Sequence, residues 1–316
     1  MNSWAVVVER PETLALDVLE LDTPGANDVV VDIDYSGIST GTERLLYNGA
    51  MPYFPGLGYP LVPGYESVGR VRRAGENCGL EPGRTVFVPG AQCFGSIRGL
   101  FGGAAQRLVV SEARVTPIDS HLGERSILLA LAATAYHALN PWADGRPALP
   151  DLIVGHGVLG RLIARLCLVL GDTRPTVWER DPIRRESDVG YTVCDPAEDT
   201  RRDYRRIIDV SGDADQLDTL IGTLARGGEI VLAGFYSQRL SFDFPPAFMR
   251  EARLRVAAEW QRSDLDAVNA LATSGQLSLD GLITHRHDAS DAARAYERAF
   301  NDASCLKTIL DWRALS

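Results

Sequence analysis

This sequence of 316 residues lacks cysteines at motif spacing, a surplus of positive charge and long apolar runs. The five cysteines are scattered and no two have C-x-x-C spacing, which argues against a disulfide framework or a zinc knuckle. With 32 Lys+Arg against 42 Asp+Glu, the net charge of -10 lacks the basic surplus of a nucleic-acid-binding protein. No apolar run is long enough for a membrane span, and the first residues lack the basic flank of a signal peptide. We therefore expect a cytoplasmic protein with no nucleic-acid partner.

Lysine is also nearly absent, since Lys307 is the only one in the chain and arginine supplies the remaining positive side chains. It lies in the strand-like run Cys305–Leu310 (CLKTIL). We expect a structural role for it rather than a catalytic one.

The composition is that of a globular protein, with 45% hydrophobic and 23% charged residues, and the length suits two domains. The first third contains short β-prone runs separated by glycine and proline, a pattern typical of a compact β-barrel or sandwich. The pattern changes at Ile127–Leu139, which is apolar at helical spacing and predicts a helix.

From Asp151 onward, strand-like and helix-like segments alternate. The expected strands are Leu152–Val154, Thr176–Glu179, Arg206–Val210, Glu229–Ala233 and Arg253–Ala258. Helices are expected at Val158–Leu170 and Ala214–Ala225. This alternation predicts an α/β fold with a doubly wound parallel sheet, the Rossmann arrangement. Near the end, a further helix is expected over Asp288–Asn301 and a strand over Lys307–Asp311.

A glycine motif joins the first of these strands to the first helix. Its members form a G-x-G-x-x-G pattern: Gly155, His156, Gly157, Val158, Leu159 and Gly160. The glycines permit a tight turn, a close approach to a pyrophosphate and close helix–strand packing, while the helix N-terminus attracts phosphate. The alternative is a tight turn without a ligand, but the strand, the helix and a suitably placed acid coincide here.

The suitably placed acid is Glu179, at the end of the next strand, where a carboxylate binds ribose hydroxyls and repels a 2′-phosphate. It favours NAD over NADP as the cofactor. Arg180, Arg184 and Arg185 follow it and leave NADP open, since an arginine could reach a phosphate. Further along, Ser211, Gly234 and Phe235 follow later strands and are also candidates for cofactor contact, with simple strand-end turns as the alternative.

The order of these features resembles the medium-chain dehydrogenase/reductase superfamily along nearly the whole chain. Matching segments are Val62–Val71 (VPGYESVGRV), Pro82–Val86 (PGRTV), Gly103–Gln106 (GAAQ), Arg226–Val231 (RGGEIV) and Leu282–Arg286 (LITHR). The resemblance implies a GroES-like β-barrel catalytic domain at 1–121, completed by 262–316, and a Rossmann domain at 122–261.

The zinc ligands of that superfamily are not at their positions in this sequence. Ser39 and Tyr65 stand where the first two catalytic ligands belong, and the third falls on Ala130. Of the four-cysteine structural lobe only Cys93 remains between Pro89 and Gly102. Because zinc needs three protein ligands in a catalytic site and four in a structural one, we expect no metal.

Without zinc, side chains must stabilise the alcohol oxygen and accept the proton. The superfamily pattern implies catalytic roles for Ser39, Thr42, Glu43, Tyr65 and Glu66. Tyr65 would relay a proton, with Glu66 or Glu43 as the final acceptor. Alternatively, Glu66 makes a barrel-stabilising bond or ion pair, and Thr42 and Glu43 belong to a turn or helix cap.

A closer resemblance, to dehydrogenases of bacteriochlorophyll biosynthesis, is carried by Ser39–Arg44 (STGTER), Tyr47–Pro52 (YNGAMP) and the run from Phe54 to Glu66. It implies NAD-dependent oxidation of the C3 1-hydroxyethyl group of a bacteriochlorophyllide, a tetrapyrrole, to acetyl. It also leaves a peripheral position at the photosynthetic membrane open.

The same region is rich in aromatic residues, which suits a large flat ligand. The pocket candidates are Tyr47, Tyr53, Phe54 and Tyr59, and the alternative is a rigid, well-packed loop. Two other functions stay open: a zinc-free quinone or enoyl reductase using NADPH, and a non-catalytic protein that binds a dinucleotide or pigment. A homodimer is the default for such folds by analogy only.

Overall fold

The computed structural model describes residues 1–53, 55–140, 147–185 and 189–315, and it divides into two compact units. The first unit contains Met1–Ala130 and Asp280–Ser316, and the second contains Leu131–Leu279. These boundaries differ from the predicted 121/122 and 261/262. The later return to the first unit arises because α7 (Arg262–Thr273) packs within the second unit, where Asp264 Oδ2 lies 2.8 Å from His137 Nδ1 on α2 (Leu129–Leu139).

The first unit is built from two β-sheets. One has the order β2-β1-β4-β7, with bounds Thr13–Glu20, Asn2–Arg10, Leu61–Val62 and Arg98–Gly99. The other has the order β16-β17-β3-β5-β6-β9, and β8 also pairs with β3. Its bounds are Ile283–Asp288, Lys307–Asp311, Asp28–Ile38, Ser67–Ala74, Thr85–Val88, Thr116–Pro117 and, for β8, Arg107–Ser111.

The last strand of the chain completes the first unit. β17 pairs antiparallel with β3 in the register Thr308↔Ile38 to Asp311↔Tyr35. The strand Lys307–Asp311 was predicted with these bounds. The helix before it, α8 (Ala292–Asn301), buries Ala295, Tyr296 and Phe300 in the core of this unit. Segments from the two ends of the chain therefore share one hydrophobic core.

The first unit also contains short helical elements. α1 (Thr42–Tyr47) follows β3 after a short turn that contains Ser39, and the 3₁₀ segment Ser120–Leu128 leads into α2. The predicted helix at Ile127–Leu139 is thus largely α2. Short 3₁₀ turns also occupy Glu112–Arg114 and Ala289–Asp291.

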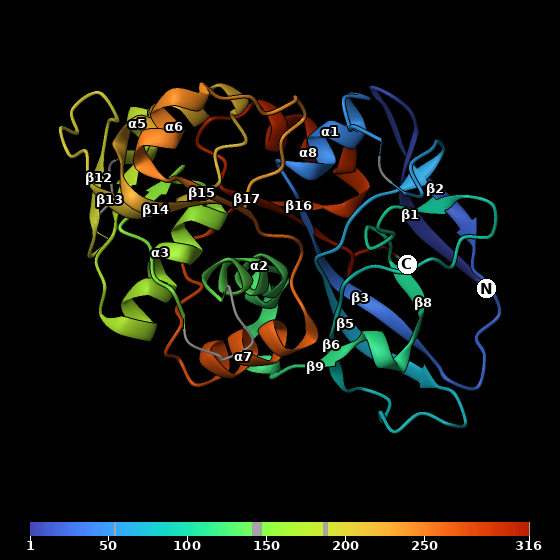
Figure 1. Cartoon of the computed structure of the whole chain (residues 1–316). Helices are drawn as coiled ribbons and strands as arrows, with labels where there is room; N and C mark the ends of the chain where they lie inside the picture. Colours follow the sequence, from blue (N-terminus) through green and yellow to red (C-terminus); the bar gives the residue numbers. More distant parts are fainter. Residues whose placement is uncertain (54, 141–146, 186–188, 316) are drawn as a thin grey trace. The chain divides into compact units, whose positions relative to one another are not determined.

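The second unit is a doubly wound parallel sheet with the order β12-β11-β10-β13-β14-β15 (Figure 1). In chain order the strands are Leu152–Val154, Thr176–Trp178, Thr192–Cys194, Tyr204–Asp209, Leu224–Leu232 and Arg253–Val256. Renumbered within the unit, this is the 3-2-1-4-5-6 order of a Rossmann fold, with its switch point between β10 and β13. The predicted fold class is confirmed.

Helices cover both faces of this sheet, as doubly wound topology requires. In Figure 1, α5 and α6 lie on one side of it and α3 on the other. The bounds are Val158–Gly171 for α3, Pro182–Arg185 for α4, Leu217–Thr223 for α5 and Phe244–Arg250 for α6. Leu217, Leu220 and Ile221 of α5 share a buried cluster with strand side chains such as Ile207 and Ile230.

One predicted helix of this unit needs correction, and some short elements were not predicted. The helix expected over Ala214–Ala225 is a 3₁₀ turn at Ala214–Gln216 followed by α5, because β14 already begins at Leu224. The four-residue α4, the three-residue β12 and α6, which has two prolines at its start, were not predicted from the sequence. None of the helices in the described ranges is both long and apolar enough to cross a membrane.

Candidate active site and nucleotide site

Ser39 and Tyr65 lie together in the first unit. Ser39 follows β3 and Tyr65 precedes β5, and these strands pair antiparallel up to Ser36↔Ser67. The backbone extends the pairing, because Gly37 N donates to Glu66 O at 2.8 Å. The Tyr65 hydroxyl donates to Ser39 Oγ at 2.8 Å. The two residues at the superfamily's metal-ligand positions thus form a hydrogen-bonded hydroxyl pair.

Tyr65 is held as a neutral phenol. Burial and the negative charge of Glu66 raise its pKa well above the ordinary value, while hydrogen bonds to the Ser39 and Thr42 side chains oppose part of the rise. Its ring meets the ring of Phe101 edge-on, with centroids 5.4 Å apart. At neutral pH Tyr65 therefore serves as a hydrogen-bond donor rather than as a tyrosinate base.

Glu43 lies beneath this pair, only 1% exposed. Its Oε1 accepts the backbone N–H of Ser39 at 3.1 Å, and its Oε2 accepts the hydroxyl of Tyr296 on α8 at 2.7 Å. Burial raises its pKa to about 7, although the hydrogen bonds from Tyr296 and Ser39 oppose the rise. Glu43 thus ties the Ser39 turn to the C-terminal helix.

Glu66 is fully buried and forms an ion pair with Lys307 of β17. Lys307 Nζ lies 2.7 Å from Oε2 and 3.0 Å from Oε1, and it also donates to the Ile38 carbonyl at 3.3 Å. Burial raises the pKa of Glu66 and the ammonium of Lys307 opposes the rise. The space is tight, since a Cβ on Gly37 would lie 2.2 Å from Glu66 Oε2. This is the barrel-stabilising ion pair that the sequence analysis held as the alternative to catalysis.

The residues at the superfamily's catalytic zinc positions do not suit that metal. A serine hydroxyl, a phenol of raised pKa and the alanine at position 130 do not form the nitrogen, thiolate or carboxylate set that zinc prefers. Within the described ranges no group of three or more His, Cys, Asp or Glu side chains could hold a metal ion. The five cysteines are free thiols.

The aromatic candidates for the substrate pocket have different environments. The Tyr47 hydroxyl donates to Glu12 O at 3.2 Å and its ring packs 5.6 Å from Phe300. The Tyr59 hydroxyl bonds to the Leu46 carbonyl and its ring packs on a second buried cluster. Tyr53 is 94% exposed, and Phe54 lies outside the described residues. Tyr47 and Tyr59 are thus anchored in the fold, whereas Tyr53 is presented to solvent.

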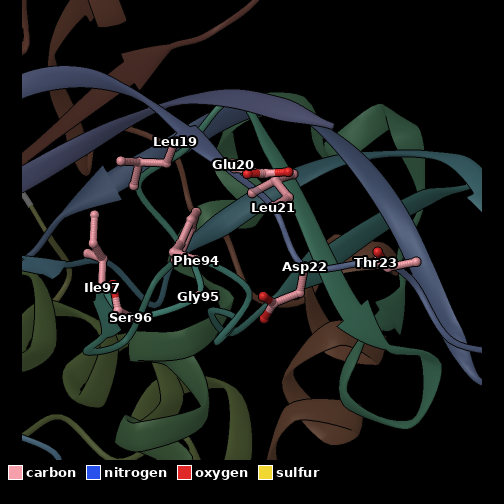
Figure 2. Close-up of a pocket in the computed structure, with 9 residues that line it drawn as sticks. All are labelled: Leu19, Glu20, Leu21, Asp22, Thr23, Phe94, Gly95, Ser96 and Ile97. Carbon is pink, nitrogen blue, oxygen red and sulfur yellow. The ribbon is translucent and has the colours of Figure 1, made fainter.

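A separate hollow of about 430 Å³ opens on the first unit (Figure 2). It is lined by Leu19–Thr23 at the end of β2 and by Phe94–Ile97. None of the predicted catalytic or pocket residues lines it. We assign no ligand to it.

The glycine motif of the second unit forms a cradle at the switch point of the sheet. Gly155 has φ +103°, in the left-handed region that favours glycine. A Cβ on Gly160 would lie 1.9 Å from Gly155 O, whereas a Cβ on Gly157 would meet nothing within 4 Å. Gly157 is also the N-cap of α3 and offers no side-chain cap to the helix. The backbone is thus close-packed behind the loop and open in front of it, which fits a dinucleotide pyrophosphate.

Glu179 follows β11 beside this loop. Its Oε2 accepts the His156 backbone N–H at 3.0 Å and its Oε1 accepts the Asp181 N–H at 2.9 Å. A carboxylate has about four acceptor positions, so ribose hydroxyls can still bind. The residue is only partly buried.

Two of the neighbouring arginines are paired with other carboxylates. Arg180 Nη1 lies 3.2 Å from Asp213 Oδ2, and Arg185 pairs with Asp195. Arg185 Nη1 also donates to the backbone carbonyl of Glu179 at 3.3 Å, so this guanidinium lies beside Glu179 although its carboxylate partner is Asp195. Arg184 lies on α4, and its carbonyl accepts from Arg161 Nη2 at 3.1 Å.

The loops after β13 and β14 lie at the same end of the sheet. Ser211 N donates to Asp209 Oδ1 at 2.9 Å, and Gly234 N donates to Asp209 O at 3.0 Å. Phe235 is 41% exposed. Val158 is buried at the start of α3 and Leu159 is partly buried.

Two hydrogen-bond partners of candidate residues were not predicted from the sequence: Tyr296 beside Glu43 and Tyr191 beside His156. Tyr236 follows Gly234 and Phe235, and its hydroxyl donates to the buried carboxylate of Asp209 at 2.8 Å. Burial raises the pKa of Asp209. No sequence pattern near these tyrosines indicates which carboxylate or imidazole each hydroxyl bonds.

Comparison with known proteins agrees with this architecture. Residues 25–120 match the alcohol dehydrogenase GroES-like domain. L-idonate 5-dehydrogenase from Escherichia coli superposes with a TM-score of 0.85 at 19% identity, covering 98% of each chain. An alcohol dehydrogenase from E. coli CFT073, solved with NADH, superposes with a TM-score of 0.83 at 20% identity, covering 98% of this chain and 99% of the other. The GroES-like domain and the Rossmann sheet define a medium-chain dehydrogenase.

Two curated relatives narrow the class. The 2-desacetyl-2-hydroxyethyl bacteriochlorophyllide A dehydrogenases of Rhodobacter capsulatus and Cereibacter sphaeroides are each 56% identical to this chain, with 99% of the chain and 99% of the relative covered. The chain belongs to this family of bacteriochlorophyllide dehydrogenases.

Proposed function

We propose that this protein is an oxidoreductase of bacteriochlorophyll biosynthesis that oxidises the C3 1-hydroxyethyl group of a bacteriochlorophyllide to acetyl, with NAD as the acceptor. The observation that carries the proposal is the 56% identity over 99% of the chain to two dehydrogenases named for a hydroxyethyl bacteriochlorophyllide. Bound NAD supplies the hydride acceptor.

The Ser39–Tyr65 pair binds the alcohol oxygen of the substrate in this proposal. Because Tyr65 donates to Ser39 Oγ, the Ser39 hydroxyl hydrogen is available to an oxygen of the substrate. As hydride leaves, the alcohol proton must also leave. In this proposal it would pass through the Ser39 and Tyr65 hydroxyls, each giving up its own hydrogen as it takes one, to Glu43 as the final acceptor, whose pKa of about 7 suits that role at neutral pH. Glu43 positions the Ser39 backbone, and Glu66 is engaged with Lys307, so neither carboxylate is required to touch the substrate.

The reaction proceeds without zinc in this proposal. Ser39, Tyr65 and Ala130 stand at the superfamily's zinc positions and are poor ligands for that metal. The substrate reduces the demand on the protein, since the reacting carbon is attached to a conjugated macrocycle. Positive charge that develops as hydride leaves would be delocalised into that ring system.

NAD is preferred over NADP because of the charge at the ribose position. Glu179 would accept hydrogen bonds from the ribose hydroxyls and repel a 2′-phosphate. The pairing of Arg180 with Asp213 and of Arg185 with Asp195 supports this preference, because both guanidinium groups already have carboxylate partners.

The test combines the purified protein with NAD⁺ and 3-hydroxyethyl bacteriochlorophyllide a. We expect NADH to appear together with a red shift of the pigment absorption, and metal analysis in parallel should find no stoichiometric zinc. Oxidation of NADPH with a quinone or enoyl substrate, without pigment turnover, would favour a reductase instead. Tight pigment binding without turnover would favour a non-catalytic role.

A further inference from the structure

His156 is enclosed within the glycine loop, with none of its surface exposed. Its side chain therefore has no exposed surface to offer a nucleotide. Its backbone already makes two bonds, because its N–H donates to Glu179 Oε2 at 3.0 Å and its carbonyl accepts from Arg161 Nε at 3.0 Å. The residue is fixed from both sides of its backbone.

The imidazole ring makes two further bonds on the side of α4 and β12. Nδ1 lies 2.7 Å from the Arg184 carbonyl oxygen and Nε2 lies 2.9 Å from the Tyr191 hydroxyl. A carbonyl only accepts, so Nδ1 carries the hydrogen and Nε2 accepts from Tyr191 in the neutral ring. Burial lowers the pKa of His156 to about 4, which keeps this tautomer neutral at physiological pH.

Three of these bonds, to Glu179, Arg184 and Tyr191, connect the loop after β10 with the segment that begins at the end of β11. Arg161 reinforces the connection by donating from Nη2 to the same Arg184 carbonyl at 3.1 Å. Glu179 lies at the start of that segment and is held by the His156 and Asp181 N–H groups. A shift of α4 away from the loop would therefore move Glu179 relative to the glycines.

We propose that His156 is a positioning residue that locks the Glu179 segment onto the glycine loop and thereby sets the preference for a dinucleotide with a free 2′-hydroxyl over one with a 2′-phosphate. The role rests on the dinucleotide binding proposed above. In this role the His156 side chain influences the choice between NAD and NADP without touching either nucleotide, because it acts through Arg184 and Tyr191.

Equilibrium binding of NAD⁺ and NADP⁺, measured by calorimetry on the full chain without pigment, tests this role. We expect His156→Ala to weaken NAD⁺ binding by about tenfold, as for the loss of buried hydrogen bonds, and NADP⁺ binding by less, so that the ratio of the two Kd values narrows. His156→Asn, which keeps a donor near the Nδ1 position, should recover part of the ratio. Tyr191→Phe should give a smaller change in the same direction.

The matched control is Tyr204→Phe. Tyr204 is a buried tyrosine of the same unit, and its hydroxyl donates to Asp199 Oδ2 at 2.5 Å, apart from the glycine loop. We expect that variant to lose stability without changing the ratio of the two Kd values. Comparison of Tyr191→Phe with Tyr204→Phe keeps the test valid even if His156→Ala fails to fold.

The outcomes separate the two proposals. Wild-type protein that binds neither nucleotide overturns the proposed cofactor and this role together. Wild-type protein that prefers NAD⁺, with an unchanged Kd ratio in His156→Ala and Tyr191→Phe, overturns the positioning role alone.

Discussion

Lys307, the only lysine of the chain, bonds both carboxylate oxygens of Glu66 in a pair that is almost completely buried, with side-chain exposures of 2% and 0%. The partners are 241 residues apart in the sequence. The pair connects the last strand of the chain to the segment that carries Tyr65. Its contribution to the free energy of unfolding depends on both charges being present.

We predict that Lys307→Met destabilises the protein by about 3–5 kcal/mol, because it leaves the Glu66 carboxylate buried without a cation. The double variant Lys307→Met with Glu66→Gln should recover more than half of the loss, since no buried charge then remains. Urea denaturation gives both free energies of unfolding. Arg286→Met, which breaks an exposed pair with Glu124, is the control and should cost no more than about 1 kcal/mol. An equally small cost for Lys307→Met would contradict the prediction.

Removal of the hydroxyl pair should impair turnover without affecting nucleotide binding. We expect Tyr65→Phe and Ser39→Ala each to lower kcat by about 100-fold or more, the usual size of a lost proton-relay contribution, with an unchanged Kd for NAD⁺. Tyr35→Phe is the control, a phenol on β3 whose ring lies 4.7 Å from the Arg313 guanidinium. Full turnover in both test variants with NAD⁺ bound would end the catalytic assignment.

Glu43 should make stability depend on pH. Its pKa is raised from 4.5 to about 7 in the folded protein, so its contribution to stability is complete below about pH 4.5 and is lost as the pH rises through about 7. The loss should be on the order of 3 kcal/mol. Glu43→Gln should lack this component when unfolding is measured between pH 5 and pH 8, whereas Glu9→Gln, on the surface, should retain it. Equal pH slopes for wild type and Glu43→Gln would show that the carboxyl does not titrate in this range.

Glu179→Ala should weaken NAD⁺ binding by about tenfold and improve NADP⁺ binding relative to NAD⁺, because ribose hydrogen bonds are lost and repulsion of the 2′-phosphate disappears. Calorimetric titration with both nucleotides gives the ratio. Glu198→Ala removes an exposed carboxylate of the same unit and should change neither affinity. Unchanged NAD⁺ affinity in Glu179→Ala would remove this residue from the cofactor site.

Two tyrosines of the aromatic segment should have different roles: Tyr53 in substrate binding and Tyr59 in stability. Tyr53→Ala should raise the pigment KM and leave the NAD⁺ KM and the melting temperature unchanged, because the ring is 94% exposed and supports no core. Tyr59→Ala should lower the melting temperature, because its hydroxyl bonds to the Leu46 carbonyl and its ring packs on a buried cluster. A larger effect of Tyr53→Ala on the NAD⁺ KM than on the pigment KM would argue against a substrate contact.

Part of the nucleotide site could be predicted from the sequence because its residues are close together along the chain. The glycine motif, the strand before it and the helix after it are contiguous, and Glu179 lies one strand further on. Their spacing alone therefore predicted the cradle that Gly155 and Gly160 form. The parallel sheet followed in the same way from the alternation of segments.

Non-local partners could not be predicted. Nothing near Glu43 in the sequence indicates that Tyr296 will donate to it, because the contact joins α1 to α8 across a separation of 253 positions. His156 was expected near the cofactor from its place in the motif, yet the packing of α4 and Tyr191 encloses its ring. Tyr53 and Tyr59 look alike in the sequence, and only the fold distinguishes the exposed ring from the anchored one.

The burial of Lys307 also has a chemical consequence for work with the folded protein. Guanidinium groups supply every other basic side-chain charge apart from histidine, so acylating reagents and amine-directed cross-linkers find no accessible side-chain amine. Acylation of Lys307 would require its strand to separate from β3. The rate of that single modification would therefore report the opening of the first unit.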